Sequence, residues 1–215
     1  MGVTAENVAR EHGVSRADQD AFAMESQTRA ARAIAEGRFK DQIVPVEIVG
    51  RKGTVVFDTD EHPKATSLEA LAGLKAVFQK DGSVTAGNAS QQNDAAAGLL
   101  VVAEDQLESL GVEPIGFLTD WAAAGCDPAR MGIGPVPAVA KLAGRAGRSV
   151  TELLDAIDVV ELNEAFAVQV LAVLGGWGWG DQDRINVNGS GISLGHPIGA
   201  TGVRMVTTML HDLRR

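Results

Sequence analysis

Apolar residues in the first half of the chain recur at helical spacing and are separated by polar loops. A first helix is expected from Thr4 to about His12, and a second begins at Ser15, whose partner Asp18 completes a capping-box pattern. The second helix should stop at Gly37, because glycine commonly follows the last residue of a helix. The other elements expected in this half are a strand at 42–49, confined to a sheet edge by Pro45, and helices at 67–74 and 104–110.

From Pro114 onward the pattern alternates between short apolar runs and amphipathic stretches. Strands are expected at 115–121, 158–162 and 184–187, and helices after Pro135, at 150–157, at 164–174 and from Ala200. This β-then-α order is typical of an α/β layered fold, in which loops at strand ends hold the chemistry. The loops after the last two strands are therefore the first places to look for a site.

The loop after the last strand, residues 188–202, contains five glycines and one titratable side chain, His196. Pro197 fixes its own φ and pushes His196 toward extended geometry, so this backbone would hold an imidazole still. An imidazole titrates near neutrality and is the usual general base. His196 is thus either a catalytic base or an exposed loop histidine without a role. Nucleotide binding by the glycines is a weaker alternative, because the Gly-x-Gly-x-x-Gly spacing is absent.

The loop after the preceding strand carries Asn163 and Glu164. Asn163 precedes a predicted helix, so it can be the N-cap of that helix, or it can order a water or an oxyanion beside His196. Glu164 is either a first-turn carboxylate favoured by the helix dipole or a catalytic partner. A third polar segment, residues 84–94, either offers its amide groups to a ligand or is a loop closed by Asn93 or Asp94.

Cys126 is the single cysteine, which excludes an intramolecular disulfide and any multi-cysteine metal site. Asp127 beside it disfavours a thiolate, so Cys126 is interpreted as a packing residue. Four histidines show no metal-ligand spacing, and no metal site is expected. Three basic side chains are interpreted as a solvated helix face: Lys141, Arg145 and Arg148.

Composition and net charge narrow the class of protein further. The chain has 215 residues, of which 45% are hydrophobic, and 28 acidic against 19 basic residues give a net charge of -9. That balance argues against nucleic acid or an anionic membrane as the main partner. Without an apolar run of about 20 residues or a signal-peptide pattern, a folded, soluble, cytoplasmic protein is expected.

Five short motifs, in this order, resemble those of the thiolase family of acyl-CoA C-acyltransferases. They cover essentially the whole chain, and their order is more specific than any one of them. The motifs are Met1-Gly2-Val3-Thr4-Ala5-Glu6-Asn7, Thr85-Ala86-Gly87-Asn88-Ala89-Ser90, Gly132-Ile133-Gly134-Pro135-Val136-Pro137, Asn163-Glu164-Ala165-Phe166-Ala167, and Asn188-Gly189 through Gly195-His196-Pro197 to Gly202.

The resemblance implies a layered α-β-α-β-α thiolase fold, present in part. Residues 1–92 would be the later part of the loop domain that covers coenzyme A. Residues 93–113 would finish the N-terminal thiolase domain, and 114–215 would be most of the C-terminal one. The chain would then be an internal-to-C-terminal fragment of such an enzyme, lacking both catalytic cysteine motifs, and Cys126 matches neither of them.

The resemblance also implies roles for single residues. His196 would activate the nucleophilic cysteine, and Asn163 would hold a water of the oxyanion hole. Four residues would meet or line the tunnel for the pantetheine arm: Ser90, Met1, Phe78 and Phe166. Coenzyme A would be a substrate, no cofactor would be permanently bound, and the family's dimers and tetramers suggest a homo-oligomer. The implied reaction is thiolysis of a 3-ketoacyl-CoA or the reverse condensation; the alternative is a non-catalytic CoA-binding or assembly subunit of a split or truncated thiolase.

Overall fold

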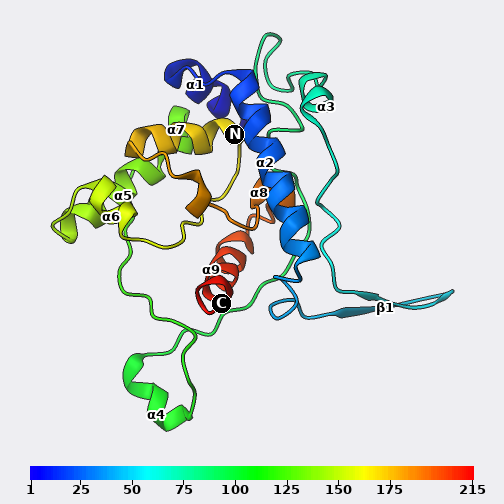
Figure 1. Ribbon diagram of the computed structural model, residues 1–215, viewed down its shortest axis with the longest axis vertical. Coiled ribbons are helices and arrows are strands. Elements are labelled where there is room, and N and C mark those ends of the chain that lie inside the picture. Colours follow the sequence, from blue (N-terminus) through cyan, green and yellow to red (C-terminus); the bar gives the residue numbers. More distant parts are fainter.

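The structure is a computed structural model that describes all residues, 1–215. Its elements follow the chain as shown in Figure 1. The α-helices are α1 (Gly2–His12), α2 (Arg16–Ala35), α3 (Leu68–Ala72), α4 (Leu107–Leu110), α5 (Pro135–Arg145), α6 (Val150–Asp155), α7 (Ala167–Trp177), α8 (Gly191–Leu194) and α9 (Thr201–Leu213). Two strands, β1 (Val46–Gly50) and β2 (Gly53–Phe57), and three 3₁₀ helices, η1 (Glu104–Gln106), η2 (Pro128–Ile133) and η3 (Gln182–Arg184), complete the set.

Both N-terminal helices form, but α1 begins at Gly2 with Met1 as its N-cap, so the predicted start at Thr4 was wrong. The Ser15 hydroxyl accepts a hydrogen bond from the Asp18 amide, and the Asp18 carboxylate accepts one from the Ser15 amide, so the predicted capping box is confirmed. This arrangement satisfies two amides that the first turn of a helix would otherwise leave unpaired. The helix α2 then runs for 20 residues along one side of the molecule (Figure 1).

The core is built around α7, which is apolar on nearly every face. Eight of its 11 residues are buried, as expected for a helix without a polar stripe. The helices α1, α2 and α5 and the 3₁₀ helix η2 pack against it, and Figure 1 shows it in the upper half of the molecule. The largest apolar cluster includes Val170, Val173 and Trp177 from α7 and Phe22 from α2. This packing fixes the segment that leads into α7, which carries Asn163.

The one regular sheet is the antiparallel hairpin of β1 and β2, in which Val46 pairs with Phe57. The strand predicted at 42–49 therefore begins only after Pro45, since proline cannot donate a hydrogen bond to a ladder. Both strands are exposed along their whole length, and the hairpin projects from the body (Figure 1).

The prediction of regular strands at 115–121, 158–162 and 184–187 was wrong for this chain. The last two meet in a single parallel bridge between Val160 and Ile185, beside which the Asn186 side chain bonds both the amide and the carbonyl of Leu162. Residues 115–121 have no partner and are largely exposed. A strand exists only when a second strand satisfies its amides and carbonyls, and this chain supplies none there.

Two long extended segments, residues 95–103 and 112–124, lead into and out of an arm that ends in η1 and α4 (Figure 1). Several of their apolar side chains face solvent, with Leu100 83% and Leu118 80% exposed. The expected helix at 104–110 is confirmed as η1 and α4. No helix of the structure is long and apolar enough to cross a membrane.

Candidate active site

Three segments far apart in the sequence cross at one place. The amide of Ala167 donates to the Asn88 carbonyl (2.9 Å), and the amide of Ser90 donates to the Ala165 carbonyl (3.0 Å). One residue further along, the Gln91 carbonyl accepts from the His196 amide (3.3 Å). Residues 88–91 thus hold the Asn163 loop and the glycine loop together. This stretch is therefore a structural connection between two loops and not a simple surface loop.

Glycine is required where these loops approach most closely. A Cβ on Gly191 would lie 2.8 Å from the Asn163 Oδ1, and one on Gly195, whose φ is 91°, would lie 2.5 Å from the Asn93 Oδ1. Real Cβ atoms do not approach neighbours this closely, and a positive φ of this kind is strained for residues with a side chain. The glycines therefore allow the backbone to bring His196 next to the Asn163 loop.

His196 is partly buried and held by its neighbours on both sides. Its Nδ1 lies 2.8 Å from the Thr201 Oγ1, and that hydroxyl donates its own proton to the Pro197 carbonyl at 2.9 Å. Because the hydroxyl has one proton, this network assigns the imidazole proton to Nδ1 and the lone pair to Nε2. The ring is therefore presented as a base at Nε2.

The Asn163 amide completes this pair. Its Nδ2 lies 3.4 Å from both ring nitrogens of His196, and its Oδ1 is buried without a hydrogen-bond partner. A buried acceptor without a partner is a candidate position for an ordered water or a substrate group. The interpretation of Asn163 as an N-cap was wrong: the N-cap of α7 is Phe166, and no side chain caps it. The helix starts late because residues 165–167 are engaged by residues 88–90.

Electrostatics keep the imidazole neutral. Burial lowers the pKa of His196 below its ordinary value of 6.5, and the positive charge of Arg204 lowers it further. Desolvation and a nearby like charge both disfavour the imidazolium. At neutral pH the ring is therefore in the form that can accept a proton.

Glu164 takes neither of the roles that the sequence left open. It lies before α7 rather than in its first turn, and its buried carboxylate accepts from the Ser26 hydroxyl, the Asn186 amide group and the Ile192 amide. Burial raises the pKa of Glu164, while these hydrogen bonds lower it. The carboxylate joins α2, the glycine loop and the Asn163 loop, so it supports the site without facing the imidazole.

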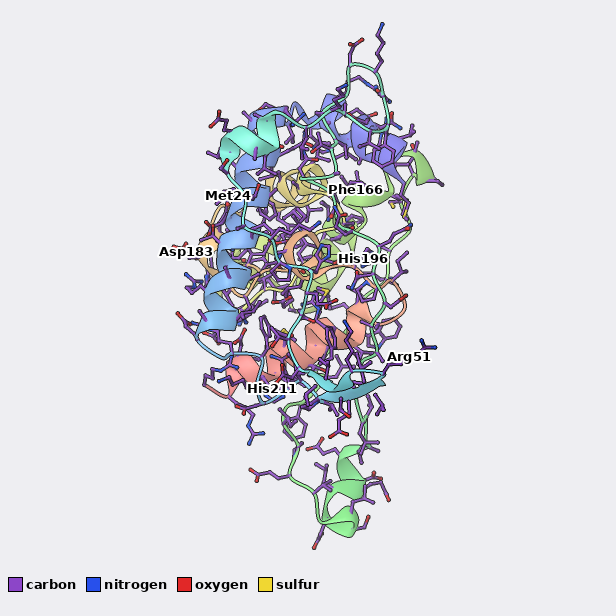
Figure 2. The ribbon with its side chains drawn as sticks, turned by 90° about the vertical axis from the view of Figure 1, so that its right-hand side faces the viewer. Met24, Arg51, Phe166, Asp183, His196 and His211 are labelled. Atoms are coloured by element: carbon purple, nitrogen blue, oxygen red, sulfur yellow. The ribbon has the colours of Figure 1, made fainter.

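The residues expected at a pantetheine tunnel also come together. The Phe78 and Phe166 rings meet edge to face, with centroids 6.2 Å apart, and Gly2, next to the exposed Met1, lies against the Phe78 ring. Phe166 is bridged to Ala89, the neighbour of Ser90. Figure 2 labels Phe166 and His196 on the side of the molecule turned to the viewer. Ser90 is in turn next to Gln91, whose carbonyl accepts from the His196 amide.

The remaining candidates lie elsewhere. Cys126 is exposed, and its Sγ has the Met131 carbonyl at 3.9 Å, so the interpretation as a packing residue was wrong. The solvated helix face is confirmed for Lys141 and Arg145, which are exposed on α5, and Arg145 pairs with Asp120; Arg148 is also exposed but lies beyond the end of that helix. No group of three or more acidic, histidine or cysteine side chains is placed to hold a metal ion.

Sequence reasoning missed Thr201, Arg204 and Glu161. Thr201 and Arg204 are three residues apart on α9 and share a face of that helix, which turns both toward the site. Arg204 also stands out as the basic residue in the middle of an otherwise uncharged stretch, 197–210. Glu161 follows Val160 in a run with the apolar pattern of a buried strand. A charged residue in such a run indicates that an oppositely charged side chain lies nearby.

Glu161 is expected to make stability depend on pH. Its carboxyl is buried without a hydrogen bond, and burial raises its pKa from 4.5 to about 8, although Arg204, 3.7 Å away, lowers it and Glu164 and Asp212 raise it. Because the folded pKa lies above the unfolded one, this contribution to stability is complete below pH 4.5 and is lost as pH rises through about 8. The slope is at most about 1.4 kcal/mol per pH unit.

A Glu161→Gln variant should lack this slope. Urea unfolding at pH 5 and pH 8 should show that the variant gains roughly 2–4 kcal/mol relative to wild type between the two pH values. Exposed Glu113, changed to Gln, is the matched control and should follow wild type. Equal pH dependence in wild type and Glu161→Gln would contradict the assignment.

Comparison with known proteins fits this geometry. Residues 1–105 match the family model "Thiolase, N-terminal domain", and residues 112–215 match "Thiolase, C-terminal domain". The chain belongs to the thiolase family. It is 49% identical over its whole length to an acetyl-CoA acetyltransferase of Syntrophomonas wolfei and 52% identical to the beta-ketothiolase BktB of Cupriavidus necator. It covers 54% of each, so the chain spans about half the length of these curated relatives.

Solved thiolase structures confirm the fold class. The crystal structure of Bacillus anthracis acetyl-CoA acetyltransferase matches with a TM-score of 0.93 at 47% identity, covering 100% of this chain and 54% of that one. Human mitochondrial 3-ketoacyl-CoA thiolase matches with a TM-score of 0.89 at 40% identity, over 100% of this chain and 53% of that one. The backbone thus has the α/β thiolase fold over the half that it covers, although several of its strand positions lack partners within this chain.

Proposed function

We propose that this thiolase-family chain carries the base and oxyanion half of an acyl-CoA C-acyltransferase. The reaction would be thiolytic cleavage of a 3-ketoacyl-CoA to acyl-CoA and acetyl-CoA, or the reverse condensation. The observation that carries the proposal is the contact of a neutral imidazole, whose lone pair is on Nε2, with the Asn163 amide, whose own oxygen is buried and unpaired. Acyl transfer needs both a base for the nucleophile and a stabilised oxyanion.

The two residues would divide these tasks. His196 Nε2 would take the proton of a thiol, and the thiolate would attack the ketone carbonyl of the substrate. The bond between the α and β carbons then breaks as the carbonyl re-forms in a thioester with the attacking thiol, and the α carbon leaves with the electron pair and takes up the proton held by His196, which gives acetyl-CoA. The thiol of coenzyme A would then attack the thioester and take the acyl group, which releases the first thiol. Asn163 would hold the water that donates to the oxyanion. Phe78, Phe166, Ser90 and Met1 would guide the pantetheine arm of coenzyme A, which acts as a substrate.

The thiol itself must come from outside these residues, because Cys126 lies beside η2. A cleft of about 1210 Å³ runs past Gly195 and Pro197, between residues 93–98, the β hairpin and α9. It is larger than a typical small-molecule pocket and its rim includes apolar side chains, so it suits a polypeptide. We infer that the remaining half of the thiolase fold occupies it and pairs with the unpaired segments at 95–103 and 115–121.

Other features of the family remain part of the proposal. Residues 1–92 would belong to the domain that covers coenzyme A, 93–113 would complete the N-terminal thiolase domain, and 114–215 would form most of the C-terminal one. A homo-oligomer, a cytoplasmic location and a role in fatty acid metabolism are proposed on the same ground, the similarity to acetyl-CoA acetyltransferases.

A chimera tests the reaction. This chain replaces the matching 54% of the Syntrophomonas wolfei acetyl-CoA acetyltransferase, which supplies the rest of the fold. We expect the chimera to cleave a 3-ketoacyl-CoA in the presence of coenzyme A, and this chain alone to show no cleavage above background. A folded chimera that binds coenzyme A in calorimetry without cleavage would support the non-catalytic alternative, which the lack of a nearby thiol favours. Loss of both binding and cleavage would refute both functions.

A further inference from the structure

One side chain that no motif includes joins all the segments of the site. Arg204, on α9, donates from Nη2 to the Ser190 hydroxyl at 3.2 Å, at the start of the glycine loop. Its Nη1 lies 3.7 Å from the Glu161 carboxyl, two residues before Asn163. One turn earlier on the same helix, Thr201 holds the Nδ1 of His196. A single guanidinium therefore connects the Asn163 loop, the glycine loop and the helix that carries the partner of the imidazole.

The charges around Arg204 are unevenly balanced. Glu161 faces it from the Asn163 loop, Glu164 lies behind that loop, and the loop at 58–62 brings Asp60 and His62. From its own helix Asp212 acts on Glu161 but is bonded to the Asn188 amide group and to Arg215. No hydrogen bond joins Arg204 to Glu161. The guanidinium is thus close to a carboxyl that does not fully neutralise it.

We propose that Arg204 is a positioning residue for His196: it ties the glycine loop to the Asn163 loop and places a fixed positive charge beside the imidazole. The inference rests on the proposed role of His196 as a base, but it is tested on this chain alone. A positive charge there opposes protonation of the ring, and the anchored loop keeps the ring against Asn163. The two effects come from one side chain and can be separated by substitution.

The electrostatic part has independent support. Arg204 is the charged group that acts on His196, after burial, in lowering its pKa. Burial raises the pKa of Glu161 to about 8, so this carboxyl stays protonated through the range in which an imidazole titrates. Arg204 then acts on the imidazole without an ionised Glu161 beside it. Above that range Glu161 ionises, but by then the imidazole is already neutral.

The test is an NMR titration of the full chain with ¹³C-labelled histidine. The His196 signal is identified by its loss in His196→Gln, and His12 and His211 are followed as internal references. Arg204→Gln removes the charge, Arg204→Lys keeps it, and Arg204→Met is a second neutral variant that leaves no amide opposite Glu161. Exposed Arg214→Gln removes the same charge near the end of α9 and is the control.

We expect the pKa of His196 to rise by roughly 0.5–1 unit in Arg204→Gln and in Arg204→Met, and to stay within about 0.2 unit of wild type in Arg204→Lys and Arg214→Gln. The neutral variants should also broaden the Asn163 side-chain amide signal, because the loop loses its anchor. A His196 pKa that is unchanged in the folded neutral variants, or that rises equally in Arg204→Lys, would overturn the proposal. If the His196 pKa does not shift as expected but the chimera is active, the role of Arg204 is refuted and the proposed function stands. If the shifts are seen but the chimera is inactive, the role of Arg204 stands and the proposed function is refuted.

Discussion

Replacing His196 by alanine in the chimera with the Syntrophomonas wolfei relative is expected to lower turnover by about 10²–10⁴-fold, the usual range for loss of a general base. Without the imidazole no group at the site can take the proton of the thiol, because Asn163 does not titrate and Glu164 is committed to three hydrogen bonds inside the fold. The loss should appear in kcat, with coenzyme A binding retained, since the pantetheine-lining residues are unchanged. Steady-state kinetics and calorimetry on the same preparation measure both.

The pH profile provides a second check on the same residue. Since burial and Arg204 lower the pKa of His196, the enzyme should keep its activity to a pH below 6.5 and lose it as the ring becomes protonated.

The exposed His12, changed to alanine, is the matched control for His196→Ala and should change turnover less than about twofold. Turnover of the His196→Ala chimera within threefold of the parent would show that another group is the base.

Removing the Glu164 side chain is expected to destabilise this chain by about 3–5 kcal/mol. The carboxylate is the common acceptor for a hydroxyl of α2, the amide group of Asn186 and the backbone amide of Ile192, at 2.6, 3.0 and 3.1 Å. Its loss leaves buried donors without partners and opens a cavity where the loops meet, and removing one member of a buried charged network has an effect of this size. Urea unfolding of Glu164→Ala and of wild type measures the difference.

Two further variants give this prediction its controls. Glu164→Gln keeps an acceptor of the same shape and should lose less than Glu164→Ala. Glu113→Ala removes an exposed glutamate and should stay within about 0.5 kcal/mol of wild type. If Glu164→Ala were as stable as Glu113→Ala, the carboxylate would not hold the loops together.

Helices were predictable from the sequence because their signals are local. Ser15 and Asp18 lie within one turn of each other and form the capping box whatever the rest of the chain does. Gly13, at φ 63°, likewise ends α1 within the same few residues. The strand at 42–49 was predictable in part. Its partner β2 is close in the sequence, across a tight turn, so pairing from Val46 onward is a local event. Pro45 prevents the residues before it from joining the ladder.

The other strands and the roles of single residues depended on distant partners. Residues 115–121 have an apolar pattern suited to a strand but no second strand in this chain, so the pattern could not become structure. Asn163 looked like a helix cap until residues 88–90 bound residues 165–167 and moved the start of α7 beyond it.

The sequence by itself determined the helices, the glycine loop that presents His196 and, through five ordered motifs, the thiolase family. These are encoded by neighbours in the chain, where spacing and residue type are sufficient. Only the tertiary structure decided that Thr201 fixes the imidazole tautomer, that Glu164 is a structural acceptor and that Arg204 joins the segments of the site. Those roles arise from side chains that meet across long stretches of sequence, and burial, which sets their charge states, exists only once the chain has folded.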